Sequence, residues 1–220
     1  MTPLQCQHIT CRRPSWNGRV PSVVRDFSAN FSEGITTVFQ GGEESGLLLS
    51  ILGMIEPPDS GEIRVFGEAV LKMETAAAHR LRDGAFGYLF THPHLLPSFT
   101  VAENIAMPYL RICGNAIEAA RERVAEVLEM AELDRACANL AIGDLDEEAH
   151  WRVAFARSIV HSPKILVAVS PPALFLLPLA KCYAEQTGAT VLWNAGTADV
   201  SGLCDRILYP GAAKSSTVLG

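Results

Sequence analysis

Residues 40–46 read Gln40-Gly41-Gly42-Glu43-Glu44-Ser45-Gly46, and they join a short apolar segment at 35–39 to a longer one at 47–55. The first segment has the length of a buried strand and the second that of a helix. A strand that runs through a glycine-containing turn into a helix directs backbone N–H groups and the positive end of the helix dipole at one point, which suits phosphate. Here two glutamates and no lysine stand at that point. The turn therefore has the position of a phosphate site but the opposite charge.

Outward from this turn, apolar periodicity predicts an alternation of strands and helices. A small β-rich part opens the chain, a helical middle follows, and a strand that is apolar throughout lies at residues 165–168. Such alternation is typical of an α/β fold with a mostly parallel core sheet. The expected strands are 4–10, 23–31, 35–39, 62–66, 86–90, 165–168, 190–193 and 206–209, and the expected helices are 47–55, 76–82, 101–110, 116–130, 147–160 and 179–186.

Composition excludes several classes of function. The 220 residues suit one domain, and a net charge of −6 without a basic cluster argues against nucleic-acid binding. No apolar run reaches the roughly 18 residues of a membrane span, and no signal-peptide pattern opens the chain, so we expect a cytosolic protein. The six cysteines contain no CxxC pair, and His92 and His94 lack further ligands nearby, so no metal site is expected.

Several further segments occur in a recognisable order along the chain. They are residues 34–67, Phe86-Gly87-Tyr88-Leu89-Phe90, Leu95-Leu96-Pro97, Thr100-Val101-Ala102-Glu103-Asn104, residues 152–157 and residues 163–171. Together they closely resemble an ABC-transporter ATP-binding subunit, nearest to the lipoprotein-release and macrolide-export type. The resemblance spans nearly the whole chain. It implies the P-loop NTPase fold over residues 1–220, with an N-terminal antiparallel β part, an α/β core at 1–91 and 162–220, and an inserted helical lobe at 92–161.

The resemblance also shows which chemical groups have been replaced. In the Walker A loop of this family, a lysine neutralises the phosphates and a hydroxyl binds magnesium; aligned from Gly41, these two positions hold Leu47 and Leu48. The loop positions are Gly41, Gly42, Glu43, Glu44, Ser45, Gly46, Leu47 and Leu48. The glutamine that senses metal and γ-phosphate corresponds to Thr91.

The remaining positions of the family's chemistry differ as well. The signature that opens a helix opposite the partner's nucleotide corresponds to Leu145, Asp146, Glu147 and Glu148, where Asp146 suits a helix N-cap. The magnesium-binding aspartate and the catalytic glutamate correspond to Val169 and Ser170, and the switch histidine to Ala195. We therefore expect a degenerate cassette, a pseudo-ATPase without catalytic residues or a metal site, that is not an enzyme and that binds ATP and magnesium weakly or not at all.

The charge of the turn supports this expectation. At an effective dielectric constant of about 20, a carboxylate about 5 Å from a phosphate charge is repelled by about 3 kcal/mol. Two alternatives stay open for Glu43 and Glu44. They point to solvent and leave the loop usable, or one of them folds back onto the N–H groups that open the helix and replaces the phosphate.

A second set of residues matches the region that, by the resemblance, grips a permease. These residues are Leu95, Leu96, Pro97, Phe99, Glu103, Asn104 and Met107. An apolar loop of this kind suits a groove that receives a helix, although the same residues could equally close the core of the lobe. We expect a structural or regulatory subunit that lies on the inner face of the cell membrane beside a permease and a second ATPase-like subunit. The alternatives are a subunit that powers transport with non-standard site residues and a soluble adaptor without a transport role.

Overall fold

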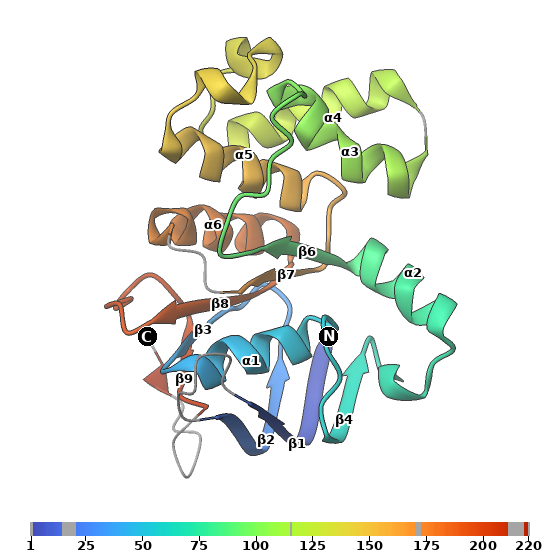
Figure 1. The fold of residues 1–220 in the computed structure, drawn as a ribbon, viewed down its shortest axis with the longest axis vertical. Coiled ribbons are helices and arrows are strands. Elements are labelled where there is room, and N and C mark those ends of the chain that lie inside the picture. The colour runs from blue at the N-terminus through green and yellow to red at the C-terminus, as the bar shows by residue number, and fades with distance from the viewer. Residues whose placement is uncertain (1, 15–20, 115, 170–172, 211–217, 220) are drawn as a thin grey trace.

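The computed structural model describes residues 2–14, 21–114, 116–169, 173–210 and 218–219, and a six-stranded sheet lies at its centre (Figure 1). The strand order is β10-β9-β3-β8-β7-β6. Neighbours from β9 to β6 are parallel, and β10 is antiparallel to β9. The strands are β3 (Thr36–Gln40), β6 (Phe86–Leu89), β7 (Ile165–Ala168), β8 (Thr190–Gly196), β9 (Arg206–Leu208) and β10 (Val218–Leu219).

A second, antiparallel sheet covers one side of the molecule. Its order is β2-β1-β4-β5, with β1 (Leu4–Arg13), β2 (Ser22–Phe31), β4 (Ser60–Val65) and β5 (Glu68–Ala69). Helix α1 (Glu43–Leu52) lies between the two sheets (Figure 1). Most of the helix is apolar, since Leu47, Leu48, Leu49, Ile51 and Leu52 are all buried, and a helix with so wide an apolar face belongs inside a core.

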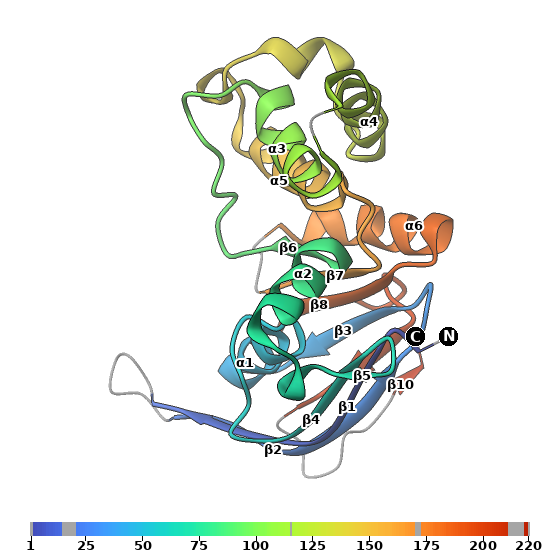
Figure 2. The ribbon, with the colours of Figure 1, turned by 90° about the vertical axis from the view of Figure 1, so that its right-hand side faces the viewer.

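Helices cover the opposite side of the central sheet. Helix α6 (Leu177–Thr187) packs closest to it, and α3 (Val101–Cys113), α4 (Ile117–Met130) and α5 (Glu147–Ile159) lie beyond (Figures 1 and 2). The remaining elements are α2 (Thr75–Ala85) and the short 3-10 helices η1 (Val70–Lys72), η2 (Arg135–Asn139), η3 (Ile142–Asp144) and η4 (Leu174–Leu176). No helix within the described ranges is both long and apolar enough to cross a membrane. The expected α/β fold, with one antiparallel and one mostly parallel sheet, is confirmed.

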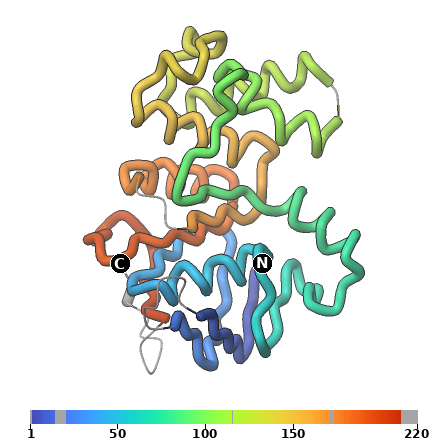
Figure 3. Tube along the Cα trace, viewed as in Figure 1, coloured from blue at the N-terminus to red at the C-terminus, as the bar shows by residue number. Residues whose placement is uncertain are grey.

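The path of the chain explains how the helices are attached. The chain leaves the sheet after β6, passes through α3, α4 and α5, and returns to the sheet at β7 (Figure 3). Strand β6 and helix α5 approach each other closely at Gly87. A Cβ atom there would collide with the carbonyl oxygen of Ser158. Only glycine therefore allows β6 to lie against the end of α5 at this point.

The main difference from the sequence prediction concerns the helix after β3. We expected it at residues 47–55, but α1 begins at Glu43 and ends at Leu52. Glutamates in the first turn complement the helix dipole, so the helix extends through residues that we expected to form a turn. Strand β8 also runs on to Gly196, so Ala195 lies within the strand and not after it.

Candidate functional site

The turn at the end of β3 is much tighter than its sequence suggested. Only Gly41 and Gly42 separate the last residue of β3 from the first residue of α1. Gly41 has a φ of 145°, a conformation that favours glycine. The four residues that follow, including Glu44 and Ser45, form the first turn of the helix. In this state the turn is therefore wound into the helix instead of forming a wide loop.

Three backbone N–H groups of the turn have internal partners. The N–H of Gly41 donates to the carbonyl of Gly196 on β8 at 3.0 Å, and the N–H of Ser45 donates to the carbonyl of Gly42 at 3.2 Å. The N–H of Gly42 donates to the side-chain Oε1 of Glu44 at 3.1 Å. Two of these three partners are other parts of the backbone, but the third is a carboxylate.

Glu44 folds back over the turn. One of our two alternatives was that a glutamate folds back in this way. A Cβ atom built on Gly42 would lie 2.8 Å from Oε2 of Glu44, and one built on Gly41 would lie 3.2 Å from Oε1. The carboxylate accepts from the N–H of Gly42, which precedes the helix. It does not reach the N–H groups near Leu47, where we expected the helix to begin, because the helix begins earlier than expected. Glu43 is exposed, and its Oε2 accepts a hydrogen bond from Ser22 at 3.0 Å.

Ser45 offers a polar group that the sequence did not single out. Its hydroxyl is fully buried and has no hydrogen-bond partner within the described part of the chain. The same Oγ lies 3.1 Å from the Cβ position of Gly41, so it is directed at the turn. Leu47 and Leu48, in contrast, are buried in the apolar core and offer no polar atom. Buried hydroxyls usually have a hydrogen-bond partner, and a water molecule, an ion or a ligand oxygen can supply one here.

Three more predicted positions lie around the ends of the central strands. Val169 follows β7, donates its N–H to the carbonyl of Leu89 at 2.8 Å, and packs against the core. Ala195 is half-buried in β8, and Thr91 is exposed after β6. Ser170, the position of the catalytic glutamate in the resemblance, lies outside the described residues. None of the three described residues brings a carboxylate to the turn.

The acidic segment before α5 behaves as a helix start. Asp146 is the N-cap, and its carboxylate accepts from the N–H of Ala149 at 2.7 Å, which confirms the predicted cap. Glu147 and Glu148 occupy the first helical turn, and Leu145 is half-buried. Glu148 also pairs with Arg152 at 2.9 Å. Part of the negative charge of the segment is therefore neutralised within the chain.

A cavity of about 350 Å³ lies at this helix start. Its lining combines the carboxylates of Glu147 and Glu148 with the apolar side chains of Trp151, Ala173 and Phe175. Arg152, from the same helix, lies over the ring of Phe175 at 5.6 Å. The cavity is thus acidic on one side and apolar on the other.

The segment before α3 is held in one conformation by Asn104. This side chain is fully buried; its Oδ1 accepts from the N–H of Leu96 at 2.8 Å. Its Nδ2 donates to the carbonyls of Leu96, Thr100 and Phe99 at 3.1, 3.0 and 3.3 Å. We expected Asn104 to contact a permease, and in this structure it positions the segment instead, because no part of it reaches the surface.

Other residues of this segment divide between support and surface. Thr100 and Glu103 form a capping box at the start of α3, and the N–H of Thr100 holds the pKa of the Glu103 carboxyl below its usual value. Leu95 is half-buried against the core. The predicted contact residues that are exposed are Leu96, Pro97, Phe99, Glu103 and Met107.

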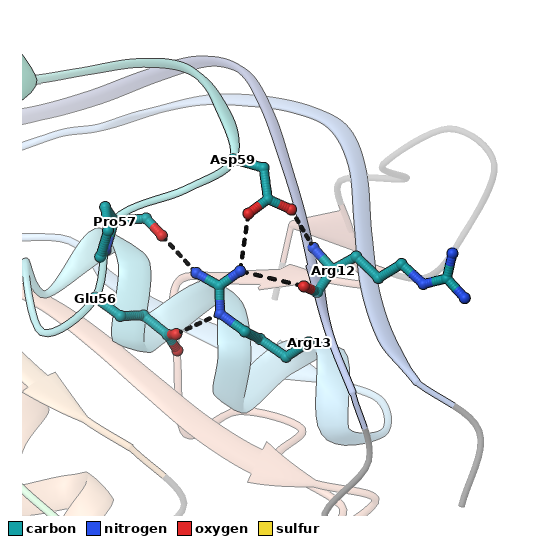
Figure 4. Close-up of polar contacts among 5 residues, drawn as sticks. All are labelled: Arg12, Arg13, Glu56, Pro57 and Asp59. Atoms are coloured by element: carbon teal, nitrogen blue, oxygen red, sulfur yellow. Dashed lines mark hydrogen bonds and ion pairs between the residues drawn. The ribbon is translucent and has the colours of Figure 1, made fainter.

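Arg13 anchors the far end of the α1 region to the antiparallel sheet (Figure 4). Its guanidinium donates to Glu56 at 2.8 Å, to Asp59 at 2.9 Å and to the carbonyl of Pro57 at 2.7 Å. Asp59 also accepts from the N–H of Arg12 at 2.8 Å, while the Arg12 side chain points away. These bonds, led by that of the Arg12 N–H, hold the pKa of Asp59 below its usual value. The chain that leaves α1 is therefore fixed to the end of β1.

Comparison with known proteins identifies the family. A family model described as ABC transporter matches residues 24–171, which is more than half of the chain. The dimeric structure of MJ0796, described as a bacterial ABC transporter cassette, is similar, with a TM-score of 0.82, 24% identity and coverage of 99% of both chains. The same cassette in a post-hydrolysis state bound to ADP and Pi has a TM-score of 0.81, with 24% identity and coverage of 99% of both chains. CbiO1 from Clostridium perfringens, described as part of the ABC transporter complex cbiONQ, has a TM-score of 0.77 and 18% identity, covering 94% of this chain and 84% of that one.

These findings contradict two of our expectations. We expected the chain not to be an enzyme, and we expected ATP and magnesium to bind weakly or not at all. The matching family and a cassette of the same fold solved after hydrolysis, with ADP and Pi bound, indicate an ATP-hydrolysing family instead. Both expectations were wrong because they rested on side-chain types, whereas a turn before a helix holds phosphate largely through backbone N–H groups that any sequence retains.

The family match and the fold agree with each other. Both sheets, the buried helix after β3 and the helices between β6 and β7 occur in a chain that superposes over nearly its full length on a transporter cassette. The chain belongs to the ABC transporter family, as an ATPase-like subunit of a transporter complex.

Proposed function

We propose that this chain is a cassette subunit whose part in its transporter complex is mainly structural or regulatory, with slow turnover at its own nucleotide site. It would lie on the cytoplasmic face of the cell membrane, bound to a permease of the lipoprotein-release or macrolide-export type and to a second cassette. Within the subunit, residues 1–91 and 162–220 would form the core, and residues 92–161 the helical lobe that meets the permease.

One observation carries this proposal: the segment before α3 is held by buried hydrogen bonds and exposes apolar side chains. Asn104 fixes its backbone from inside, so little conformational entropy remains to be lost on binding. Leu96, Phe99 and Met107 stay 39–40% exposed. Exposed apolar side chains on a rigid segment suit the apolar face of a partner helix.

The residues present at the nucleotide site are the reason why we propose slow turnover. Gly41 and Gly42 bring no side chains of their own to the turn, and the Ser45 hydroxyl, which has no partner among the described residues, suits a phosphate or its metal, so the turn fits nucleotide phosphates in part. Val169 brings no oxygen ligand for magnesium, and Leu47 brings no positive charge. A bound magnesium nucleotide would supply the phosphoryl group and its own counter-charge. The chain itself would hold the phosphates through backbone N–H groups without neutralising them.

A second candidate is a subunit that powers transport itself with non-standard ligands. The observation that favours it is the pair of oxygen donors at the turn, the Ser45 hydroxyl and the Glu44 carboxylate, which are ligands of the kind magnesium takes. In that case the metal would be held from the turn and not from the end of β7.

The experiment is purification of the tagged chain from native membranes in mild detergent, with identification of the proteins that accompany it. We expect a polytopic permease and a second cassette with the wild type, and their loss with Phe99→Asp. Phe66→Asp is the matched control, since Phe66 is also 40% exposed but lies at the end of β4, away from the helices. Retention of the permease by Phe99→Asp, or no permease in any sample, would contradict the proposal.

The same complex separates the two candidates. Ser45→Ala removes the only side-chain hydroxyl that we place at the turn. If the subunit is mainly structural or regulatory, ATP hydrolysis by the complex should change less than about twofold, because the second cassette does most of it. If this chain powers transport, the rate should fall by tenfold or more, as losses of a metal-ligating hydroxyl do.

A further inference from the structure

We propose that Glu44 is an internal competitor for phosphate, whose carboxylate occupies the anion-binding position of the turn and must swing away before a nucleotide binds. This inference rests on the proposed function, because it assigns a residue that tunes the affinity of the same nucleotide site. Glu44 lowers the affinity of the site for polyphosphate ligands, so removal of its charge should raise that affinity.

The Glu44 carboxylate occupies the place that a phosphate oxygen would take. Glu44 Oε1 accepts from the N–H of Gly42, at the positive end of the α1 dipole, at 3.1 Å. An oxyanion of a phosphate group would seek the same donor and the same dipole. Two anions cannot share one amide. Phosphate can therefore reach the Gly42 N–H only when Glu44 has left it.

The buried hydroxyl of Ser45 also favours entry of a ligand into the turn. It has no partner among the residues that the structure describes, although its Oγ is directed at Gly41. A turn built only to be closed by Glu44 would leave this hydroxyl without a function. A ligand oxygen that enters the turn as Glu44 leaves would give the Ser45 hydroxyl the partner that it lacks.

The Glu44 side chain is free to move away from the turn. The side chain is half-buried and, among the described residues, forms no ion pair and accepts one hydrogen bond, from the N–H of Gly42. Beside Gly42 the nearest atoms all belong to Glu44 itself, and beside Gly41 the other near side-chain atom is the Ser45 Oγ. Rotation of the side chain toward solvent breaks one hydrogen bond and leaves the core unchanged.

The test compares Glu44→Gln with Glu43→Gln. Both variants remove one negative charge at neighbouring positions, but Glu43 contacts Ser22 and not the Gly42 amide. We would titrate the full chain with ATP and with tripolyphosphate, with and without magnesium, by calorimetry. At an effective dielectric constant of about 20, removal of a carboxylate about 5 Å from a phosphate charge corresponds to about a hundredfold in affinity. We therefore expect Glu44→Gln to bind at least tenfold more tightly than wild type, and Glu43→Gln by less than about threefold.

Three results would overturn the inference. They are equal effects of the two variants, weaker magnesium-dependent binding by Glu44→Gln, which would make Glu44 a metal ligand, and no binding by any variant at millimolar ATP. A readout that does not need ligand is amide hydrogen exchange at Gly42, which should be faster in Glu44→Gln than in Glu43→Gln. Retention of the permease by Phe99→Asp, or absence of a permease from every sample, together with the expected Glu44 effect would refute the proposed function alone, so the two failures are distinguishable.

Discussion

Replacement of Asn104 tests how the contact segment before α3 is held. The side chain is fully buried and satisfies the N–H of Leu96 and the carbonyl of Phe99, which have no other hydrogen-bond partner among the described residues. The carbonyls of Leu96 and Thr100 each accept a second hydrogen bond that the replacement does not remove. The donor to Leu96 is the N–H of Phe99, and the donor to Thr100 is the backbone N–H of residue 104. Asn104→Ala thus leaves two buried groups unpaired. At about 1–3 kcal/mol each, the free energy of unfolding should fall by about 2–4 kcal/mol.

Asn104→Asp separates hydrogen bonding from simple packing. The aspartate keeps an oxygen for the N–H of Leu96 but turns its second oxygen toward three carbonyl groups. It should therefore destabilise the protein more than Asn104→Ala at neutral pH, and less so in acid, where a protonated carboxyl can donate to one carbonyl.

Urea unfolding followed by tryptophan fluorescence measures these differences. Asn139→Ala is the matched control, because Asn139 is exposed on η2 and should change the free energy of unfolding by less than about 0.5 kcal/mol. A loss below about 0.5 kcal/mol in Asn104→Ala, or Asn104→Asp as stable as Asn104→Ala, would refute the argument that Asn104 fixes the segment.

Three further predictions follow from contacts elsewhere. The pKa of Asp59 is lowered from 3.8 in the folded state, so its contribution to stability is present above that value and is lost as the pH falls through the lower folded value. Melting curves of wild type and Asp59→Asn should therefore differ above about pH 4 and converge in stronger acid. Gly87→Ala forces a Cβ atom against the carbonyl of Ser158 and should cost about 3 kcal/mol in urea unfolding, or prevent folding. Asp146→Ala removes the N-cap of α5 and should cost about 1 kcal/mol by the same assay, with Asp146→Asn close to wild type.

Local sequence patterns were sufficient for most of the elements. The expected strand at residues 165–168 coincides with β7, and the Asp146 cap marks the start of α5. Both features depend on a few neighbouring residues: a run of apolar side chains in one case, and a side chain that bonds an amide three residues on in the other. The order of the longer strands and helices likewise followed from periodicity, whereas the two-residue strands β5 and β10 were not predicted.

The start of α1 depends on contacts that neighbouring residues do not determine. The amide of Gly41 is held by Gly196, which is distant in sequence but adjacent across β3 and β8, and Glu43 contacts Ser22 on β2. These partners meet only after both sheets have formed around the helix. Sequence reasoning therefore located the turn but not its conformation.

The chain's residues by themselves determined the α/β alternation, the family resemblance and the acidic character of the turn, because these follow from side-chain type and spacing. Only the packed molecule decided that Glu44 lies on the Gly42 amide, that Ser45 is buried with no partner in the described part of the chain, and that Asn104 supports its segment from inside. The physical reason is that hydrogen-bond partners and burial are set by groups brought together in space, often from opposite ends of the chain.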